Sequence, residues 1–164
     1  MTDPSVLVLG VGNLIQSDDG VGIHVVHELE RRTLPPDVEL LDGGMMGAEL
    51  IGFLQGRGKV IIVDAMGAEG GPGTLYRIPF EELTVSSSVP FSTHSPGLGE
   101  LLQCCKRLDP RPEIVVYGIV PETTVLGMEM SDAVRKQVPK IASLIQREVT
   151  ERFSSERAVS YLPR

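Results

Sequence analysis

With 164 residues, of which 41% are hydrophobic, the chain is long enough to form one domain whose single core needs neither disulfides nor a structural metal. Its formal net charge of −7 disfavours binding to nucleic acid or to an anionic membrane surface. No apolar run approaches the roughly 18 residues that span a bilayer, and residues 1–4 do not resemble the start of a signal peptide, so we expect a cytoplasmic protein.

The first part of the chain alternates expected strands and helices. Val6–Leu9 is a continuous apolar run, which is typical of a strand buried on both faces. Apolar residues then recur at helical spacing between Asp19 and Arg32, and the prolines at 35–36 prevent that helix from continuing. A second strand is expected over Val38–Leu41, and a short helix follows over Ala48–Leu54.

The same alternation continues through the middle of the chain. Val60–Val63 is the most apolar predicted strand and is therefore expected at the centre of the sheet. The glycine-rich segment Gly67–Gly73 predicts a loop, and Thr74–Ile78 predicts another strand. A helix is expected to begin near Ser95, with Pro96 at its first helical position.

The last part of the chain predicts one more strand and one long helix. The strand covers Ile114–Tyr117, and the helix begins near Ser131 and is expected to bend at Pro139. Residues after about Phe153 are polar and aperiodic, which favours a flexible tail. The helix residues expected to face the core are Val134, Val138, Ile141, Leu144, Ile145 and Val149.

This pattern predicts an α/β fold, a three-layer α/β/α sandwich with a largely parallel central sheet. We expect residues 1–153 to form a single domain and residues 154–164 to form the tail. In such folds ligands bind beyond the carboxyl ends of the strands, so the loops that follow the predicted strands are where a site is expected.

A glycine pair follows the first predicted strand and raises the possibility of dinucleotide binding. Gly10 and Gly12 match the first two glycines of the fingerprint, but Ile15 occupies the position of the third. The acidic residue expected about 20 positions further on is also missing, because Asp42 lies too far along the chain. The dinucleotide fingerprint therefore fails.

Four carboxylates and one histidine stand at expected strand ends or helix starts. Asp18 and Asp19 precede the first helix, Asp42 and Asp64 follow two strands, and His94 precedes a later helix. Carboxylate oxygen and imidazole nitrogen together suit a divalent first-row metal ion, and so few ligands would leave coordination positions open for a substrate.

Each of these residues also has a simpler interpretation. Asp18 or Asp19 could cap the first helix, and Asp42 before two glycines could be an ordinary turn residue. His94 could be a surface or capping residue. Asp64 ends a very apolar strand, where a buried carboxylate needs partners. The combination of residues, rather than any single one, supports a metal-contacting site.

Taken together, short motifs distributed along residues 5–150 resemble the hydrogenase maturation endopeptidases in both order and spacing. The motifs lie at residues 10–13, 17–22, 42–44, 63–65, 94–99 and 118–122.

The resemblance implies an endopeptidase with an α/β fold whose metal-contacting residues are Asp19, Asp64 and His94. It also implies the substrate, a nickel-loaded large-subunit precursor of a nickel-iron hydrogenase, from which a C-terminal extension is removed. The nickel would then be carried by the precursor, and no organic cofactor is expected. A metal-polarised water or a carboxylate would attack the peptide bond, and Asp42 is a candidate base if its loop turns inward.

The sequence departs from the family pattern at two positions. Some members carry glutamate where this chain has Asp19, and many carry threonine where it has Met45. Aspartate at position 19 keeps a carboxylate as the ligand type, whereas methionine at position 45 lacks the threonine hydroxyl that could affect substrate choice.

Two other functions compete with the endopeptidase. A nucleoside-handling enzyme would need basic residues near the glycine loops, yet residues 10–22 contain no Lys or Arg. A nickel carrier or chaperone would need a tighter site than two carboxylates and one histidine, and histidine-rich tracts are absent from the sequence. We expect a monomer, since nothing in the sequence requires an interface.

Overall fold

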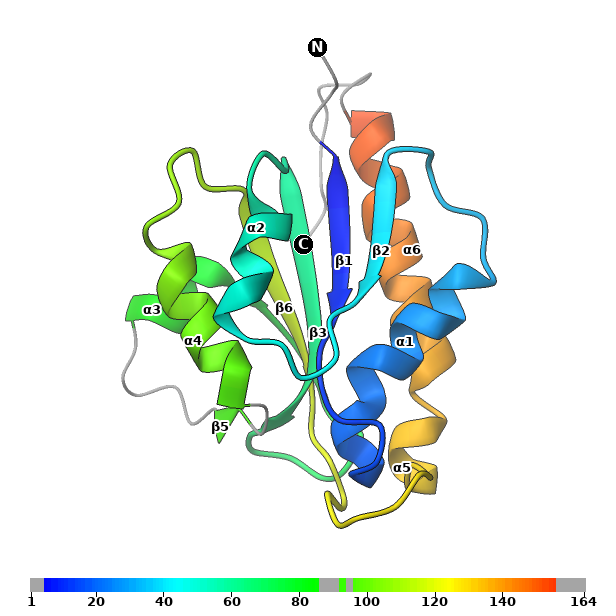
Figure 1. Ribbon diagram of the computed structural model, residues 1–164. Helices are drawn as coiled ribbons and strands as arrows, with labels where there is room; N and C mark the ends of the chain where they lie inside the picture. The colour runs from blue at the N-terminus through cyan, green and yellow to red at the C-terminus, as the bar shows by residue number, and fades with distance from the viewer. Residues whose placement is uncertain (1–4, 86–91, 94–95, 156–164) are drawn as a thin grey trace.

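The computed structural model describes residues 5–85, 92–93 and 96–155, and its centre is one sheet with the strand order β2-β1-β3-β6-β4 (Figure 1). Strands β1, β2, β3 and β6 pair in parallel, whereas β4 runs antiparallel to β6 at one edge. A short strand, β5, pairs antiparallel with the end of β3. The strands are β1 (Val6–Gly10), β2 (Val38–Asp42), β3 (Lys59–Gly67), β4 (Leu75–Pro79), β5 (Ser92–Thr93) and β6 (Glu113–Ile119).

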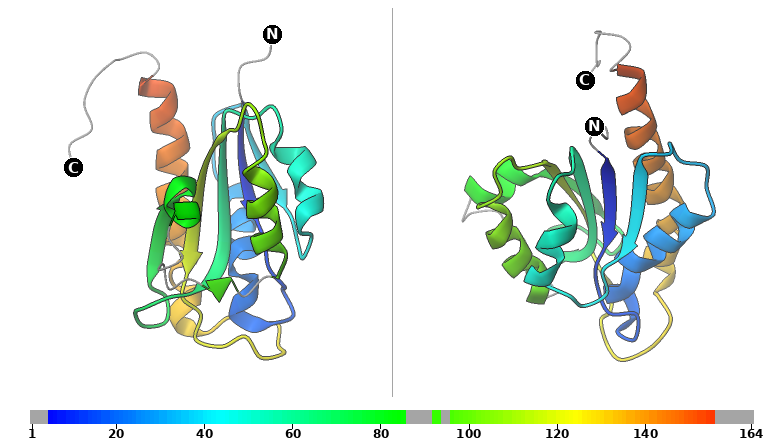
Figure 2. Two further views of the ribbon diagram at one scale, coloured as in Figure 1. Left: turned by 90° about the vertical axis from the view of Figure 1, so that its left-hand side faces the viewer. Right: turned by 45° about the horizontal axis from the view of Figure 1, so that its top comes forward.

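Helices cover both faces of this sheet (Figures 1 and 2). One face packs against α1 and α6, and the other against α2, α3 and α4. The predicted three-layer α/β sandwich with a largely parallel sheet is therefore confirmed. The helices are η1 (Ser17–Gly20), α1 (Val21–Glu30), η2 (Ala48–Leu50), α2 (Ile51–Leu54), α3 (Phe80–Val85), α4 (Pro96–Cys105), α5 (Asp132–Arg135) and α6 (Val138–Ser155).

The central strands are apolar throughout because they supply side chains to two cores at once. In β3, Ile61 and Val63 pack on the α1 and α6 side, whereas Val60 and Ile62 pack on the opposite side. Successive side chains of a strand point to opposite faces, so a strand covered on both faces cannot alternate apolar with polar residues. The prediction that Val60–Val63 lies at the centre is confirmed, since β3 pairs with both β1 and β6.

Helix α1 approaches the ends of β1 and β3 more closely than a side chain would allow. A Cβ atom added at Gly22 would lie 2.1 Å from the carbonyl oxygen of Val63, and one added at Gly10 would lie 2.4 Å from the carbonyl oxygen of Gly22. Both distances are too short for non-bonded atoms. The glycines in the first loop and helix therefore allow the backbone of α1 to contact the sheet directly.

The C-terminal helical region differs from its prediction. Instead of one helix bent at Pro139, two helices form, α5 and α6, with Lys136 and Gln137 between them. The Ser131 hydroxyl caps α5 by accepting the backbone N–H of Val134. Pro139 is the second residue of α6, where its missing N–H leaves no helical hydrogen bond unmade.

The predicted core face of this region is correct except at one residue. Val134, Ile141, Ile145 and Val149 are fully buried, but Leu144 is 41% exposed. Since Ile141, Ile145 and Val149 are spaced four residues apart, they define the buried stripe of α6, and Leu144 falls beside it.

Two short elements, α3 and β5, were not predicted. Both lie between the predicted strand that ends at Ile78 and the helix predicted to begin near Ser95. With six and two residues, they are too short to show a clear periodicity. The predicted start near Ser95 lies outside the described residues, and α4 is described from Pro96. Helix α6 continues to Ser155, two residues beyond the predicted domain end, and residues 156–164 are not described. Within the described ranges, no helix is both long and apolar enough to cross a membrane.

Replacing Gly22 with alanine should destabilise the fold by about 1–3 kcal/mol, because the new methyl group must push α1 away from the Val63 carbonyl. Gly52→Ala is a matched control in α2, since a Cβ added there meets no atom within 4 Å. This control should be neutral or stabilising by up to about 1 kcal/mol. Chemical denaturation measures both changes, and equal stability of the two variants would contradict the close packing of α1.

Candidate active site at the carboxyl edge of the sheet

The carboxyl ends of the parallel strands bring three of the predicted residues to one edge of the sheet, the lower edge in Figure 1. In register, Gly10 at the end of β1 pairs with Asp42 of β2 on one side and with Val63 of β3 on the other. Asp64 follows Val63 directly. The loop after β1 leads into η1, which carries Asp19.

Backbone hydrogen bonds join the loops at this edge into one frame. Gly12 N–H donates to the Gly44 carbonyl over 2.9 Å, and Val11 N–H donates to the Val63 carbonyl over 3.0 Å. Gly12 has a φ of +139°, and a Cβ added there would lie only 2.0 Å from the carbonyl oxygen of Asp19. The backbone of Asp19 is therefore packed against the loop after β1, and that loop is bonded to the loop after β2 and to strand β3.

Asp19 is 4% exposed, and its carboxylate faces the loop after β1. Its Oδ2 accepts the backbone N–H of Asn13 over 2.9 Å. Helix α1 has Gly20 at its N-cap position and no side-chain cap bond, so the simpler interpretation of Asp18 or Asp19 as the helix cap is wrong.

Asp18 has a structural role that the sequence did not reveal. The side chain is fully buried, and its two oxygens accept four hydrogen bonds. The donors are the backbone N–H groups of Glu122, Thr123 and Ser131, over 2.9, 3.1 and 2.7 Å, and the hydroxyl of Ser131, over 2.8 Å. Because these donors are more than 100 residues further along the chain, no local pattern could have indicated the role.

Asp64 is fully buried on the face of the sheet that α2 and α4 cover. It alternates with Ile62 and Met66, which both pack in the core on that side. Its Oδ1 accepts the backbone N–H of Ala65 over 2.8 Å. A carboxylate at this depth requires compensation by partners, as the sequence predicted.

The chain before His94 returns to the end of β3. Thr93 in β5 pairs with Met66, two residues after Asp64. Gly97, near the start of α4, lies against the loop after β2, since a Cβ added at Gly97 would be 2.7 Å from the Cα of Gly47. His94 itself lies outside the described residues, so its predicted role as a metal ligand stays a prediction.

Asp42 projects to the opposite face of the sheet from Asp64. It alternates with Val38 and Leu40, which pack against the core on the α1 side. Its Oδ1 accepts the N–H of Gly44 over 2.9 Å, and its Oδ2 lies 3.6 Å from Nε2 of His27 in α1. These contacts are those of a turn residue, and the role of Asp42 as a catalytic base stays a prediction.

Across the described residues, no group of three or more His, Cys, Asp or Glu side chains is arranged to hold a metal ion. Of the three predicted ligands, the described part of the chain includes Asp19, which lies in η1, and Asp64, which lies in β3.

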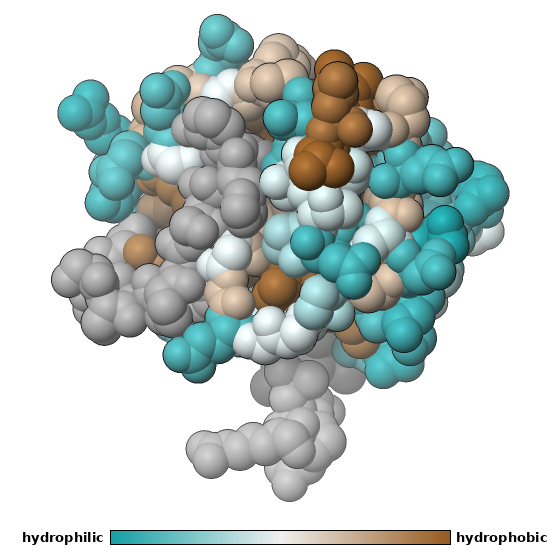
Figure 3. Space-filling model, turned by 90° about the horizontal axis from the view of Figure 1, so that it is seen from below, coloured by the Kyte–Doolittle hydropathy of each residue, from teal (hydrophilic) through white to brown (hydrophobic). Residues whose placement is uncertain are grey.

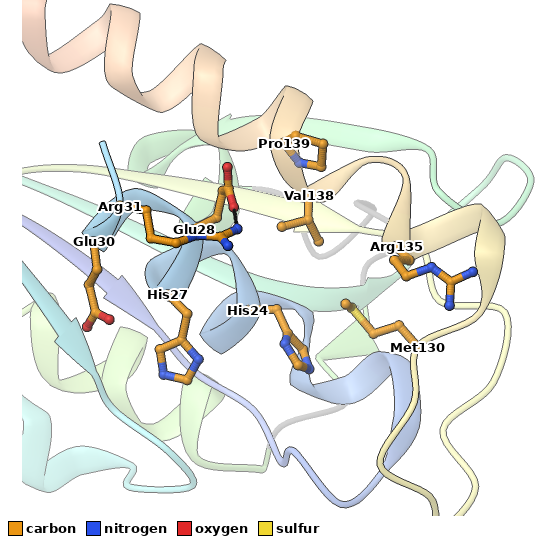
Figure 4. Close-up of a pocket in the computed structure, with 9 residues that line it drawn as sticks. All are labelled: His24, His27, Glu28, Glu30, Arg31, Met130, Arg135, Val138 and Pro139. Carbon is orange, nitrogen blue, oxygen red and sulfur yellow. Dashed lines mark hydrogen bonds and ion pairs between the residues drawn. The ribbon is translucent and has the colours of Figure 1, made fainter. Parts of the chain in front are cut away.

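A separate hollow of about 710 Å³ lies between α1 and the segment that contains α5 and the start of α6 (Figure 4). Burial and the neighbouring His27 lower the pKa of His24, one of its lining residues. Neither Asp19, Asp42 nor Asp64 lines it, so it is distinct from the carboxylate edge. The lining residues are His24, His27, Glu28, Glu30, Arg31, Met130, Arg135, Val138 and Pro139.

Comparison with known proteins identifies one family. The model of the hydrogenase maturation proteases matches residues 23–148. The Hydrogenase 2 maturation protease of Escherichia coli K12 is 36% identical over 121 residues, covering 72% of this chain and 74% of that protein. The hydrogenase expression/formation protein HoxM of Azotobacter vinelandii is 32% identical over 142 residues, covering 84% of this chain and 69% of that protein.

Solved structures agree with this result. The hydrogenase maturating endopeptidase HybD of Escherichia coli superposes with a TM-score of 0.78 at 28% identity, covering 90% of this chain and 93% of that chain. The NiFe hydrogenase maturation protease HycI of Thermococcus kodakarensis KOD1 gives a TM-score of 0.73 at 27% identity, covering 89% of this chain and 92% of that chain. These matches support the endopeptidase over the nickel carrier and the nucleoside-handling enzyme.

Loss of the Asp18 carboxylate should destabilise the protein. Asp18→Ala leaves four donors without their charged acceptor, so we expect the free energy of unfolding to fall by about 2–4 kcal/mol. Asp132→Ala is a suitable control, because the Asp132 side chain is 89% exposed and makes only a surface ion pair with Arg135, and it should cost less than about 1 kcal/mol. Urea denaturation distinguishes the two, and equal losses would argue against a structural role for Asp18.

Proposed function

Because the chain belongs to the hydrogenase maturation protease family, we propose that it removes the C-terminal extension from the nickel-loaded large-subunit precursor of a nickel-iron hydrogenase. Membership of this family makes the chain a hydrolase of the endopeptidase class. Beyond the endopeptidase class, the proposal names the position of cleavage, the nickel in the precursor and the residues that recognise this nickel.

The observation that carries the proposal is the position of Asp19 and Asp64 in one hydrogen-bonded frame. Val63, which precedes Asp64, accepts the N–H of Val11, and Gly12 packs directly on the carbonyl of Asp19. As whole residues, Asp19 is 4% exposed and Asp64 is fully buried. Attraction between a carboxylate and a divalent cation is stronger in such a setting than in water.

We propose that Asp19, Asp64 and His94 contact the nickel that the precursor carries. Two carboxylates and one imidazole are suitable ligands for a first-row divalent ion and leave the remaining coordination positions to the precursor. Cleavage would then depend on the nickel, because a precursor without the metal would lack the group that these side chains recognise. Nickel is in this scheme part of the substrate.

The chemical step is hydrolysis of one peptide bond. A water molecule, polarised by the metal or deprotonated by a carboxylate, adds its oxygen to the carbonyl carbon. The carbon–nitrogen bond then breaks, and the leaving nitrogen takes up a proton. Asp42 is the candidate base that the sequence suggested, although in the structure its carboxylate lies on the α1 face beside His27.

We also propose that the enzyme acts as a cytoplasmic monomer whose partner is the precursor rather than nucleic acid or a membrane. The formal net charge of −7 supports this choice of partner, since it disfavours polyanionic surfaces.

The first test is to incubate the protein with nickel-loaded and nickel-free precursor and to weigh the products by mass spectrometry. We expect the loaded precursor alone to lose a C-terminal peptide, because the metal is the recognised group. Cleavage of both forms would disprove nickel recognition but preserve the endopeptidase, and cleavage of neither would contradict the proposed substrate.

A second test concerns the proposed ligands. Disturbing even an outer partner of a metal ligand commonly costs about 10–100-fold in affinity or activity, so His94→Ala should reduce processing of the loaded precursor at least that much. Lys140→Ala, which removes an exposed side chain of α6, should process normally. Both variants should keep the wild-type circular dichroism spectrum. Normal processing by His94→Ala would rule out the assigned ligand set.

A further inference from the structure

Two neighbouring loops at the carboxyl edge expose large apolar side chains to solvent. Ile15 is 49% exposed, Val125 67%, Leu126 81% and Met128 67%. We refer to these four residues as the apolar rim. Figure 3 views this edge of the molecule and shows a compact group of strongly hydrophobic side chains standing out from a largely hydrophilic surface.

The two loops of the apolar rim are bonded to each other. Gly127 N–H donates to the carbonyl of Ile15, and Ser17 N–H donates to the carbonyl of Gly127, each over 2.8 Å. The Ser17 hydroxyl also donates to the carbonyl of Val125 over 2.7 Å. An isolated parallel bridge between Gln16 and Gly127 results.

Asp18 fixes both ends of the second loop to the body of the protein. Its buried carboxylate accepts the N–H groups of Glu122 and Thr123 at the start of the loop, and the N–H and hydroxyl of Ser131 at its end. The loop is therefore anchored by a charge-assisted network, in which each hydrogen bond is stronger than one between neutral groups.

This anchoring prevents the apolar side chains from folding away from water. A loop without such bonds could move its leucine and valine side chains into contact with the protein surface, whereas this backbone is held at both ends and in the middle. Contiguous exposed apolar residues on a rigid support are typical of a protein interaction site. Binding there would cost little conformational entropy, because the loop is already ordered.

The apolar rim is also continuous with the carboxylate edge. Ile15 lies two residues after Asn13, whose N–H binds the Asp19 carboxylate, and Asp18 is the neighbour of Asp19 in η1. The apolar rim thus belongs to the same bonded stretch of backbone as Asp19. Their partner is expected to present an apolar surface of its own.

We propose that the apolar rim is a docking surface for the hydrogenase large-subunit precursor, which contacts it through an exposed apolar patch while its metal reaches the carboxylate edge. This inference rests on the proposed function for the identity of the partner. Binding at the rim would position the precursor independently of the metal contacts, so nickel-free precursor would dock there as well.

The test is to measure the dissociation constant of the nickel-free precursor for the wild-type protein and for Leu126→Asp. An apolar anchor commonly contributes enough that its loss weakens binding about tenfold or more, and a buried charge adds to this effect. Leu144→Asp is the matched control, since Leu144 is a 41% exposed leucine of α6, a helix that contains none of the four rim residues. It should bind like the wild type.

Unfolding in urea and sedimentation are measured on the same samples. We expect Leu126→Asp to keep the stability of the wild type, because Leu126 is 81% exposed and supports no core, and we expect Leu144→Asp to remain folded. Weaker binding by Leu126→Asp alone supports the docking surface, even if the wild type fails to cleave the precursor and the proposed function is wrong. Three results overturn the docking proposal: no precursor binding by the wild type, equal binding by all three proteins, or a wild-type dimer that Leu126→Asp converts to a monomer.

Discussion

The direct contact between the backbone of α1 and the ends of β1 and β3 is the constraint on which the rest of the edge depends. Gly10 and Gly22 allow the helix to approach so closely that the Val63 carbonyl would meet any side chain at position 22. Asp19 precedes this helix by two residues, and Asp64 follows Val63. The same packing that stabilises the sandwich thus places a loop carboxylate and a strand carboxylate on one edge of the sheet.

Two adjacent aspartates perform different tasks at this edge. Asp18 is fully buried and satisfies four donors from the segment after β6, so its charge stabilises the arrangement of the loops. Asp19 accepts one backbone N–H and faces the loop after β1. Asp18 thereby holds rigid the backbone from which Asp19, the proposed metal contact, projects.

The alternation of side chains along strands separates the other two carboxylates. Asp42 projects toward α1 and pairs with His27, whereas Asp64 projects toward α2 and α4. The hollow beside α1 lies near His27 and thus on the side away from Asp64. The proposed docking surface lies at the carboxyl edge instead, where the hydrogen-bonded loops around Ile15 and Leu126 expose apolar side chains.

The sequence by itself determined the α/β class, the order of the main elements, the central position of Val60–Val63 and the family resemblance, because these depend on periodicity and local spacing. It could not separate the roles of Asp18 and Asp19, because the two residues are adjacent in the sequence. Only the structure shows that backbone N–H groups after residue 121 donate to the Asp18 carboxylate. Nor could it show the face to which Asp42 points or the break between α5 and α6. Tertiary structure decided these points, because each depends on contacts between segments that are distant in sequence and close in space.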